Sequence, residues 1–201
     1  MKIIDYIDDR RWELCDDNHK SKCKVPNWFL GLIYHESEYI KDIEDIKYAL
    51  ETGTYRGYTT EFLCDHFEKV YSIEKYPDQN FYGGDSLRDI YTQLEAKYSN
   101  LKINIGDSSS ILPSVLSNHV NESFVFIFDA HNGPNGPLLE ELEAVNRYST
   151  NKNHIIIIDD WGDFTSQHDL LKTKIYNINY NYTIKEAPFG RAGILIAYIK
   201  K

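Results

Sequence analysis

Cysteine, methionine and long apolar runs are all scarce in this chain of 201 residues. It holds three cysteines and one methionine, and charged or polar residues interrupt every apolar stretch. A membrane-spanning helix needs about 20 consecutive apolar residues, so no membrane span is predicted. The N-terminus lacks the apolar stretch of a secretory signal. The odd number of cysteines fits reduced thiols, and together these features indicate a cytoplasmic protein.

Positive charge is also in short supply. Lysine and arginine number 22 against 31 aspartates and glutamates, which gives a net charge of −9. A field of this sign repels phosphate, so the composition argues against nucleic acid and against an anionic membrane surface as partners. The hydrophobic share of 42% and the charged share of 26% are those of a globular protein. Folding as a single domain is expected at this length.

The hydrophobic pattern changes near residue 46. Residues 1–45 are mostly polar and predict an N-terminal helical arm or lid, whereas residues 46–201 alternate short apolar strands with amphipathic helices. Such alternation predicts an α/β, Rossmann-like doubly wound sheet, mostly parallel, because unbroken apolar strands are covered on both faces. The last two strands are joined by too few residues for a helical crossover and should form an antiparallel hairpin. The expected strands are 46–50, 70–73, 101–105, 123–128, 155–158, 180–186 and 192–199, and the expected helices are 58–68, 87–98, 109–118, 138–148 and 164–172.

Acidic residues follow five of the predicted parallel strands. Ligands of open α/β sheets bind outside the carboxyl ends of the strands. A rim of carboxylates repels itself unless cations or hydrogen-bond donors meet it, so a functional role is favoured. The structural alternative is that some of these residues cap the helices that follow. They are Glu51, Glu74, Asp107, Asp129, and Asp159 with Asp160.

The first of these strand ends opens a glycine-containing turn, Glu51-Thr-Gly-Thr-Tyr-Arg-Gly57-Tyr-Thr-Thr60. Glycine lets a backbone turn tightly and approach a ligand closely. The turn is not GxGxxG and lacks the lysine of a P-loop, which disfavours a dinucleotide or ATP. Its acid, amides and hydroxyls suit a ligand with an amino-acid end. Glu74, about 20 residues after the turn, suits ribose hydroxyls.

Together these motifs resemble class I S-adenosylmethionine-dependent methyltransferases. The likeness rests on the glycine turn, on Glu74, on Gly106-Asp107-Ser108 and on the closing hairpin, and it covers most of the chain. The family implies a sheet of about seven strands with S-adenosylmethionine over its carboxyl edge. By the resemblance, the cofactor-binding residues are Glu51, Gly53, Thr54, Tyr55, Gly57, Thr59, Glu74, Asp107, Ser108 and Asp129.

Two later motifs are similar to sugar O-methyltransferases. The segment Phe128-Asp-Ala-His-Asn-Gly-Pro-Asn-Gly-Pro137 is similar to small enzymes of this kind, including one domain of a chlorovirus glycan-building protein. Ile158-Asp-Asp160 resembles the paired acids of macrocin-type, metal-dependent members. The resemblance implies methyl transfer to a sugar hydroxyl, a viral source, and Mg²⁺ or Mn²⁺ held by Asp129, Asp159 and Asp160. Ala130-His131 departs from the Gly-Asp pattern of the macrocin-type enzymes.

Several roles stay open at this point. His131 is the predicted general base, since a neutral imidazole is available near pH 7. Asp129 either orients His131 or binds the metal, and Asp159 is predicted to be catalytic with it. Trp161 and Phe164 form either a wall for a sugar ring or part of the core. The alternatives for function are a non-sugar acceptor, a hydroxylase or a non-catalytic binding module, and a homo-oligomer is a further partner to consider.

Overall fold

The computed structural model describes residues 45–78, 86–130, 136–149, 152–179, 181–187 and 192–200. The predicted N-terminal arm lies outside these ranges except for its last residue. His131 and most of the loop after Asp129 also lie outside them.

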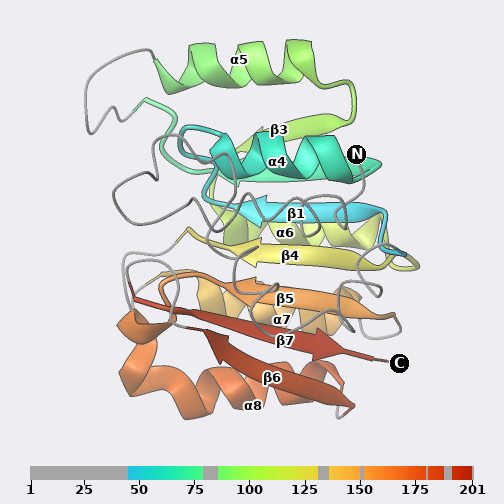
Figure 1. Ribbon diagram of the computed structural model, residues 1–201, viewed down its shortest axis with the longest axis vertical. Coiled ribbons are helices and arrows are strands. Elements are labelled where there is room, and N and C mark those ends of the chain that lie inside the picture. Colours follow the sequence, from blue (N-terminus) through green and yellow to red (C-terminus); the bar gives the residue numbers. More distant parts are fainter. Residues whose placement is uncertain are drawn as a thin grey trace, which may run out of the picture.

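A single seven-stranded sheet organises the described chain, in the order β3-β2-β1-β4-β5-β7-β6 (Figure 1). The first five strands are mutually parallel, and β7 runs antiparallel to both β5 and β6. This confirms the predicted Rossmann-like sheet with its C-terminal antiparallel pair. The strands are β1 Tyr48–Thr52, β2 Lys69–Glu74, β3 Leu101–Ile105, β4 Phe124–Phe128, β5 His154–Ile158, β6 Tyr182–Ala187 and β7 Ile194–Ile199.

Helices cover both faces of the sheet, and each face has its own apolar core. One core joins α4 and α5 to alternate residues of the strands, and the other joins α6, α7 and α8 to the remaining ones. This alternation follows from the two-residue period of a strand that is buried on both sides. The helices are α4 Tyr58–His66, α5 Leu87–Lys97, α6 Ser108–Ser117, α7 Leu138–Tyr148 and α8 His168–Ile178, with a 3₁₀ segment η3 at Trp161–Gln167.

Two predicted boundaries are wrong in ways that matter for the site. The first strand extends to Thr52, so Glu51 is a buried strand residue and not the first residue of the turn. The last predicted helix, 164–172, is a 3₁₀ turn followed by α8, which continues to Ile178 along a buried apolar stripe. Trp161 and Phe164 both lie in the second core, which bears out core packing and not a wall for a ligand.

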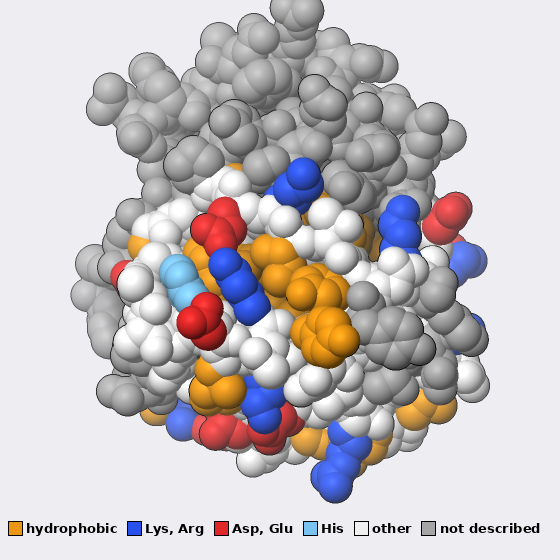
Figure 2. All heavy atoms as spheres, turned by 90° about the horizontal axis from the view of Figure 1, so that it is seen from below, with side chains coloured by type: hydrophobic (Ala, Val, Ile, Leu, Met, Phe, Trp, Pro, Cys, Tyr) orange, Lys and Arg blue, Asp and Glu red, His pale blue; other side chains and the backbone are white. Residues whose placement is uncertain are grey.

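The two edges of the sheet carry charged groups that discourage pairing with another strand. At the β3 edge, the Ile103 N–H donates to the Glu95 carboxylate at 2.8 Å. Figure 2 views the end of the molecule that holds β6 and α8, where hydrophobic, acidic and basic side chains are interspersed. Lys185 and Glu186 belong to that edge strand. In the ranges that the structure describes, no helix is both long and apolar enough to cross a bilayer.

Candidate active site at the carboxyl edge of the sheet

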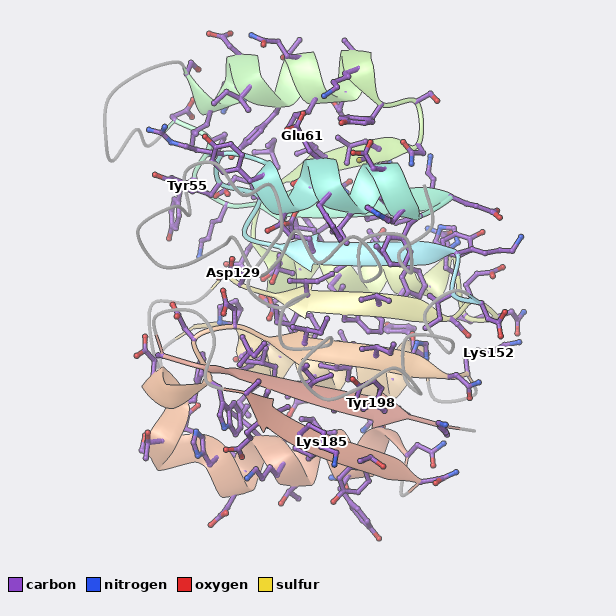
Figure 3. The ribbon with its side chains drawn as sticks, in the orientation of Figure 1. Tyr55, Glu61, Asp129, Lys152, Lys185 and Tyr198 are labelled. Carbon is purple, nitrogen blue, oxygen red and sulfur yellow. The ribbon has the colours of Figure 1, made fainter. Side chains whose placement is uncertain are left out.

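The turns that follow β1, β2, β4 and β5 lie next to one another at the carboxyl ends of these parallel strands, called here the carboxyl edge of the sheet. Thr52 pairs with Ile73 on one side and Phe128 on the other, and Phe128 pairs with Ile158. The Asp129 N–H donates to the Thr52 carbonyl, and the Asp159 N–H donates to the Phe128 carbonyl, both at 3.1 Å. Figure 3 shows Tyr55 and Asp129 at this edge and Lys152 at the opposite one. Parallel topology thus gathers the predicted strand-end acids on one side.

The glycine turn after β1 needs its first glycine for two separate reasons. Gly53 has φ 87°, a left-handed conformation that side chains disfavour. A Cβ at this position would lie 2.5 Å from the Asp129 carbonyl oxygen, closer than real Cβ atoms come. Gly57, with φ 75°, closes the turn by donating to the Thr54 carbonyl at 2.8 Å, and α4 begins at the next residue. The β1 turn is therefore pressed against the end of β4 without an intervening side chain.

Glu51 is a buried acid held by two hydroxyl groups. Its Oε2 accepts hydrogen bonds from Thr60 Oγ1 at 2.6 Å and from Ser72 Oγ at 2.7 Å. Burial raises the pKa of Glu51 to about 7, although the two hydroxyl donors work against the shift. The same Ser72 hydroxyl is hydrogen-bonded to Thr54 at 2.6 Å. A ligand cation reaching Glu51 would therefore meet an acid that ionises close to neutral pH.

Glu74 ends β2 with both carboxylate oxygens fixed by backbone amides. The Tyr55 N–H donates to Oε2 at 2.9 Å, and the Tyr76 N–H donates to Oε1 at 2.8 Å. Tyr55 has φ 43°, so the glycine turn adopts a strained conformation at the residue that bonds Glu74. A carboxylate oxygen accepts more than one hydrogen bond. The fixed carboxylate keeps acceptor capacity for ligand hydroxyls.

Asp107 has a structural role that accounts for both of its oxygens. It caps α6 by accepting from the Ser109 backbone N–H at 3.0 Å and from the Ser109 hydroxyl at 2.6 Å, and it pairs with Lys75 Nζ at 2.6 Å. The Lys75 ammonium, followed by the Ser109 hydroxyl, holds the pKa of Asp107 below its usual value. Asp107 therefore matches the helix-cap alternative, and an additional contact to a ligand stays a prediction.

The three acids predicted to bind a metal lie on neighbouring strand ends. Asp129, directly after β4, is an exposed residue, yet its carboxyl group is surrounded by protein. The surrounding protein raises its pKa, and the negative charges of Asp159, Glu51 and Asp160 add to the shift. Asp160 has φ 48° and precedes η3 without a side-chain cap.

Asp129, Asp159 and Asp160 can hold a divalent ion only if their carboxylates come close to one another. Among the residues that the structure describes, no three acidic, histidine or cysteine side chains come close enough to hold one ion. Asp129, Asp159 and Asp160 share an edge without converging as ligands. The described residues thus give no support to the predicted metal site.

Sequence reasoning missed several polar residues that shape this edge. Thr60, and not the predicted Thr59, bonds Glu51, and Ser72 reaches the same acid from β2. Glu141 of α7 is fully buried, and burial raises its pKa to about 7, an effect that the neighbouring Ser108 and Thr52 hydroxyls oppose. None of the three shows a sequence signal, because a hydroxyl residue on a helix or strand is ordinary, and so is an acid in the first turn of a helix.

Comparison with known proteins shows which solved structures share this fold. No protein-family profile matches the sequence, and neither does any curated protein. Human methyltransferase-like protein 13 in complex with SAH has a similar structure, with a TM-score of 0.55, 17% identity, and coverage of 93% of this chain and 83% of that one. A putative O-methyltransferase from Klebsiella pneumoniae gives a TM-score of 0.52 at 17% identity, covering 87% and 80%.

A third similar structure carries a different activity in its name. Precorrin 8W decarboxylase from Methanobacterium thermoautotrophicum gives a TM-score of 0.50 at 14% identity, covering 78% of this chain and 82% of that one. Identities this low show a shared fold only. The chain has the Rossmann-like fold of class I methyltransferases, and its reaction has to be argued from its own residues.

Proposed function

We propose that this chain is an S-adenosylmethionine-dependent O-methyltransferase. The observation that carries the proposal is the environment of Glu51, a buried acid with a pKa of about 7 behind a turn that only glycine can form. A buried acid destabilises the fold when it ionises, unless a cation meets it. The ammonium of an amino-acid ligand is such a cation. The low-identity structural neighbours with methyltransferase names agree with this proposal.

The proposed binding roles follow the order of the strands. Glu51 meets the ammonium, while backbone N–H groups in the first turn of α4 meet the carboxylate. Glu74, held by the amides of Tyr55 and Tyr76, accepts from the ribose hydroxyls. Ser108 and the Asp107 region border the adenine. The cofactor supplies a methyl group on a sulfonium, and the protein aligns the acceptor oxygen with it.

A sugar hydroxyl is the acceptor that we propose, on the strength of the sequence resemblance. Such a hydroxyl is a weak nucleophile and needs a base near it. The candidates are His131 and, two residues before it, Asp129. The raised pKa of Asp129 suits a proton acceptor, because a stronger base removes the hydroxyl proton more readily. In this account Asp129 either takes the proton or orients the His131 ring.

We derive no step through a divalent metal, because the described carboxylates do not converge on one position. A metal that chelates vicinal hydroxyls would supply a Lewis acid here. Asp129, Asp159 and Asp160 would be its ligands by the sequence resemblance. Chelation is therefore an arm of the functional test.

Methyl transfer to sugars can be measured by the mass of the product. We expect the chain to add one methyl group to a sugar or glycoside and not to a catechol, with turnover unchanged in excess EDTA. Asp129→Asn should lower turnover by about 100-fold, the scale typical of a lost general base or its orienting group. Asp65→Asn, at an exposed position of α4, should match the unmodified protein.

Each arm of this experiment contradicts a different part of the proposal. Methylation of the catechol alone would replace the sugar acceptor. Loss of turnover in EDTA, restored by Mg²⁺, would require the metal site that the described carboxylates do not form. Full activity of Asp129→Asn would remove Asp129 from the chemistry.

A further inference from the structure

Tyr91 is a buried phenol next to the proposed ribose-binding acid. It lies in the middle of α5 with 4% of its surface exposed, and its hydroxyl oxygen has no hydrogen-bond partner among the described residues. Leaving a buried polar group unpaired destabilises the folded state, because the group has given up its hydrogen bonds to water. A phenylalanine would fill the same space without that cost. Packing alone therefore does not explain why this position carries a hydroxyl group.

The packing of α5 directs Tyr91 toward the glycine turn. Leu87, Tyr91 and Leu94 form the buried stripe of this helix, and residues three or four apart share a helix face. The Leu94 side chain packs at Gly57, where an added Cβ would collide with Leu94 Cδ1. Tyr91, one turn earlier on the same face, thus points to the side of the turn where Glu74 ends β2.

The electrostatic setting agrees with this placement. Burial raises the pKa of the Tyr91 phenol, and the neighbouring Glu74 carboxylate raises it further, by its charge and as a hydrogen-bond partner within reach. Glu51 adds a smaller effect of the same sign. The phenol is therefore a neutral O–H donor that faces both acids, and Glu74 is the acid it affects more strongly.

We propose that Tyr91 is a positioning residue for the ribose subsite, whose O–H donates to the Glu74 carboxylate once a ligand is bound. The Tyr55 and Tyr76 amides hold that carboxylate from two sides, and Tyr91 supplies a third donor from α5. With three donors in place, the remaining lone pairs of Glu74 are directed at the ribose hydroxyls. This inference rests on the proposed cofactor, S-adenosylmethionine.

A double-mutant cycle measured by calorimetry with S-adenosylhomocysteine tests the inference. Tyr91→Phe should weaken binding about five- to tenfold, the value of one hydrogen bond to a charged group. In a Glu74→Gln background the same change should cost less than about twofold, because the shared partner has gone. The melting temperature of Tyr91→Phe should equal or exceed that of the unmodified protein. Tyr98→Phe, at the C-terminal end of α5, is the matched control and should change neither quantity.

The outcomes separate this inference from the proposed function. Unchanged affinity in Tyr91→Phe, or losses that multiply fully with Glu74→Gln, would overturn the role of Tyr91 while leaving the cofactor proposal intact. A lower melting temperature with proportionate losses in both backgrounds would make Tyr91 a packing residue only. Failure of the unmodified protein to bind S-adenosylhomocysteine would overturn the cofactor proposal itself.

Discussion

Replacing Glu51 with glutamine is expected to make the protein more stable above pH 7 while weakening its hold on the cofactor. The stability effect follows from the raised pKa. Glu51 has a pKa of about 7 in the folded chain against an ordinary value of 4.5, so between these values the folded state keeps a proton that the unfolded state releases. Its contribution to stability is complete below pH 4.5 and is lost as pH rises through 7. Above pH 7 the ionised, buried carboxylate costs about 3 kcal/mol.

Glutamine carries no charge at any pH, and its carbonyl oxygen still accepts from Thr60 and Ser72. We therefore expect a gain approaching about 3 kcal/mol in the free energy of unfolding at pH 8 and little change at pH 4, measured by denaturant titration. Affinity for S-adenosylhomocysteine should fall at least about tenfold, because the ammonium loses a charged partner.

Glu141→Gln provides the matched control for this substitution. Glu141 is as deeply buried and has the same pKa of about 7, yet its neighbours are Ser108 and Thr52 and not the Thr60 and Ser72 hydroxyls that hold Glu51. It should show a similar gain in stability at pH 8 with a much smaller loss of affinity. Equal losses of affinity in both variants, or an unchanged affinity in Glu51→Gln, would contradict an ammonium-binding role for Glu51.

Replacing Gly53 with alanine should abolish methyl transfer for geometric reasons. Alanine would have to adopt the left-handed conformation that glycine holds here, which costs roughly 1–2 kcal/mol, and its Cβ would collide with the Asp129 carbonyl oxygen. Backbone atoms on both sides cannot give way as a flexible side chain can, so the turn must move from the end of β4. A displacement on this scale should lower turnover by about 100-fold or more. The mass of the methylated product, measured at saturating sugar, gives the turnover.

Gly193→Ala is the control that separates the cost of a left-handed alanine from the effect of moving the β1 turn away from β4. Gly193 has φ 79°, close to that of Gly53, but its added Cβ would lie 3.2 Å from the Ala187 carbonyl oxygen, so a shift of only a few tenths of an ångström is needed. This variant should lose a comparable amount of stability and keep its turnover. Retention of full activity by Gly53→Ala would show that the turn does not need to contact the end of β4.

Much of the fold could be predicted because its signals are local. The helix at Leu138–Tyr148 and the strand at Leu101–Ile105 have the bounds that their apolar spacing predicts. The end of β1 was misplaced because the apolar run stops at Leu50. The strand continues because Thr52 pairs with Ile73 and Phe128, two neighbours that a local pattern does not reveal.

The site was predictable where chain geometry demands a particular residue. Gly53 was found because close approach and positive φ leave few alternatives. Thr60, Ser72 and Tyr91 were missed because a hydroxyl on a helix or strand looks the same in sequence whether it faces water or a buried acid. Their roles arise only from tertiary contacts.

The metal site stays a prediction, because no described group of acidic, histidine or cysteine side chains supports it. Asp129, Asp159 and Asp160 were expected to share a metal because Ile158-Asp-Asp160 resembles the paired acids of metal-dependent sugar O-methyltransferases. Sharing an edge fixes which turns are neighbours, yet it does not fix where each carboxylate points. Asp107 illustrates the same limit, since Lys75 and Ser109 account for both of its oxygens.

Calorimetric titration of the intact chain with S-adenosylhomocysteine tests the central claim most directly. We predict saturable binding of one ligand per chain, with a rise in melting temperature that follows ligand concentration because the ligand binds only the folded state. The absence of both binding heat and any shift in melting temperature at millimolar ligand would contradict the claim that this sheet edge is a cofactor site.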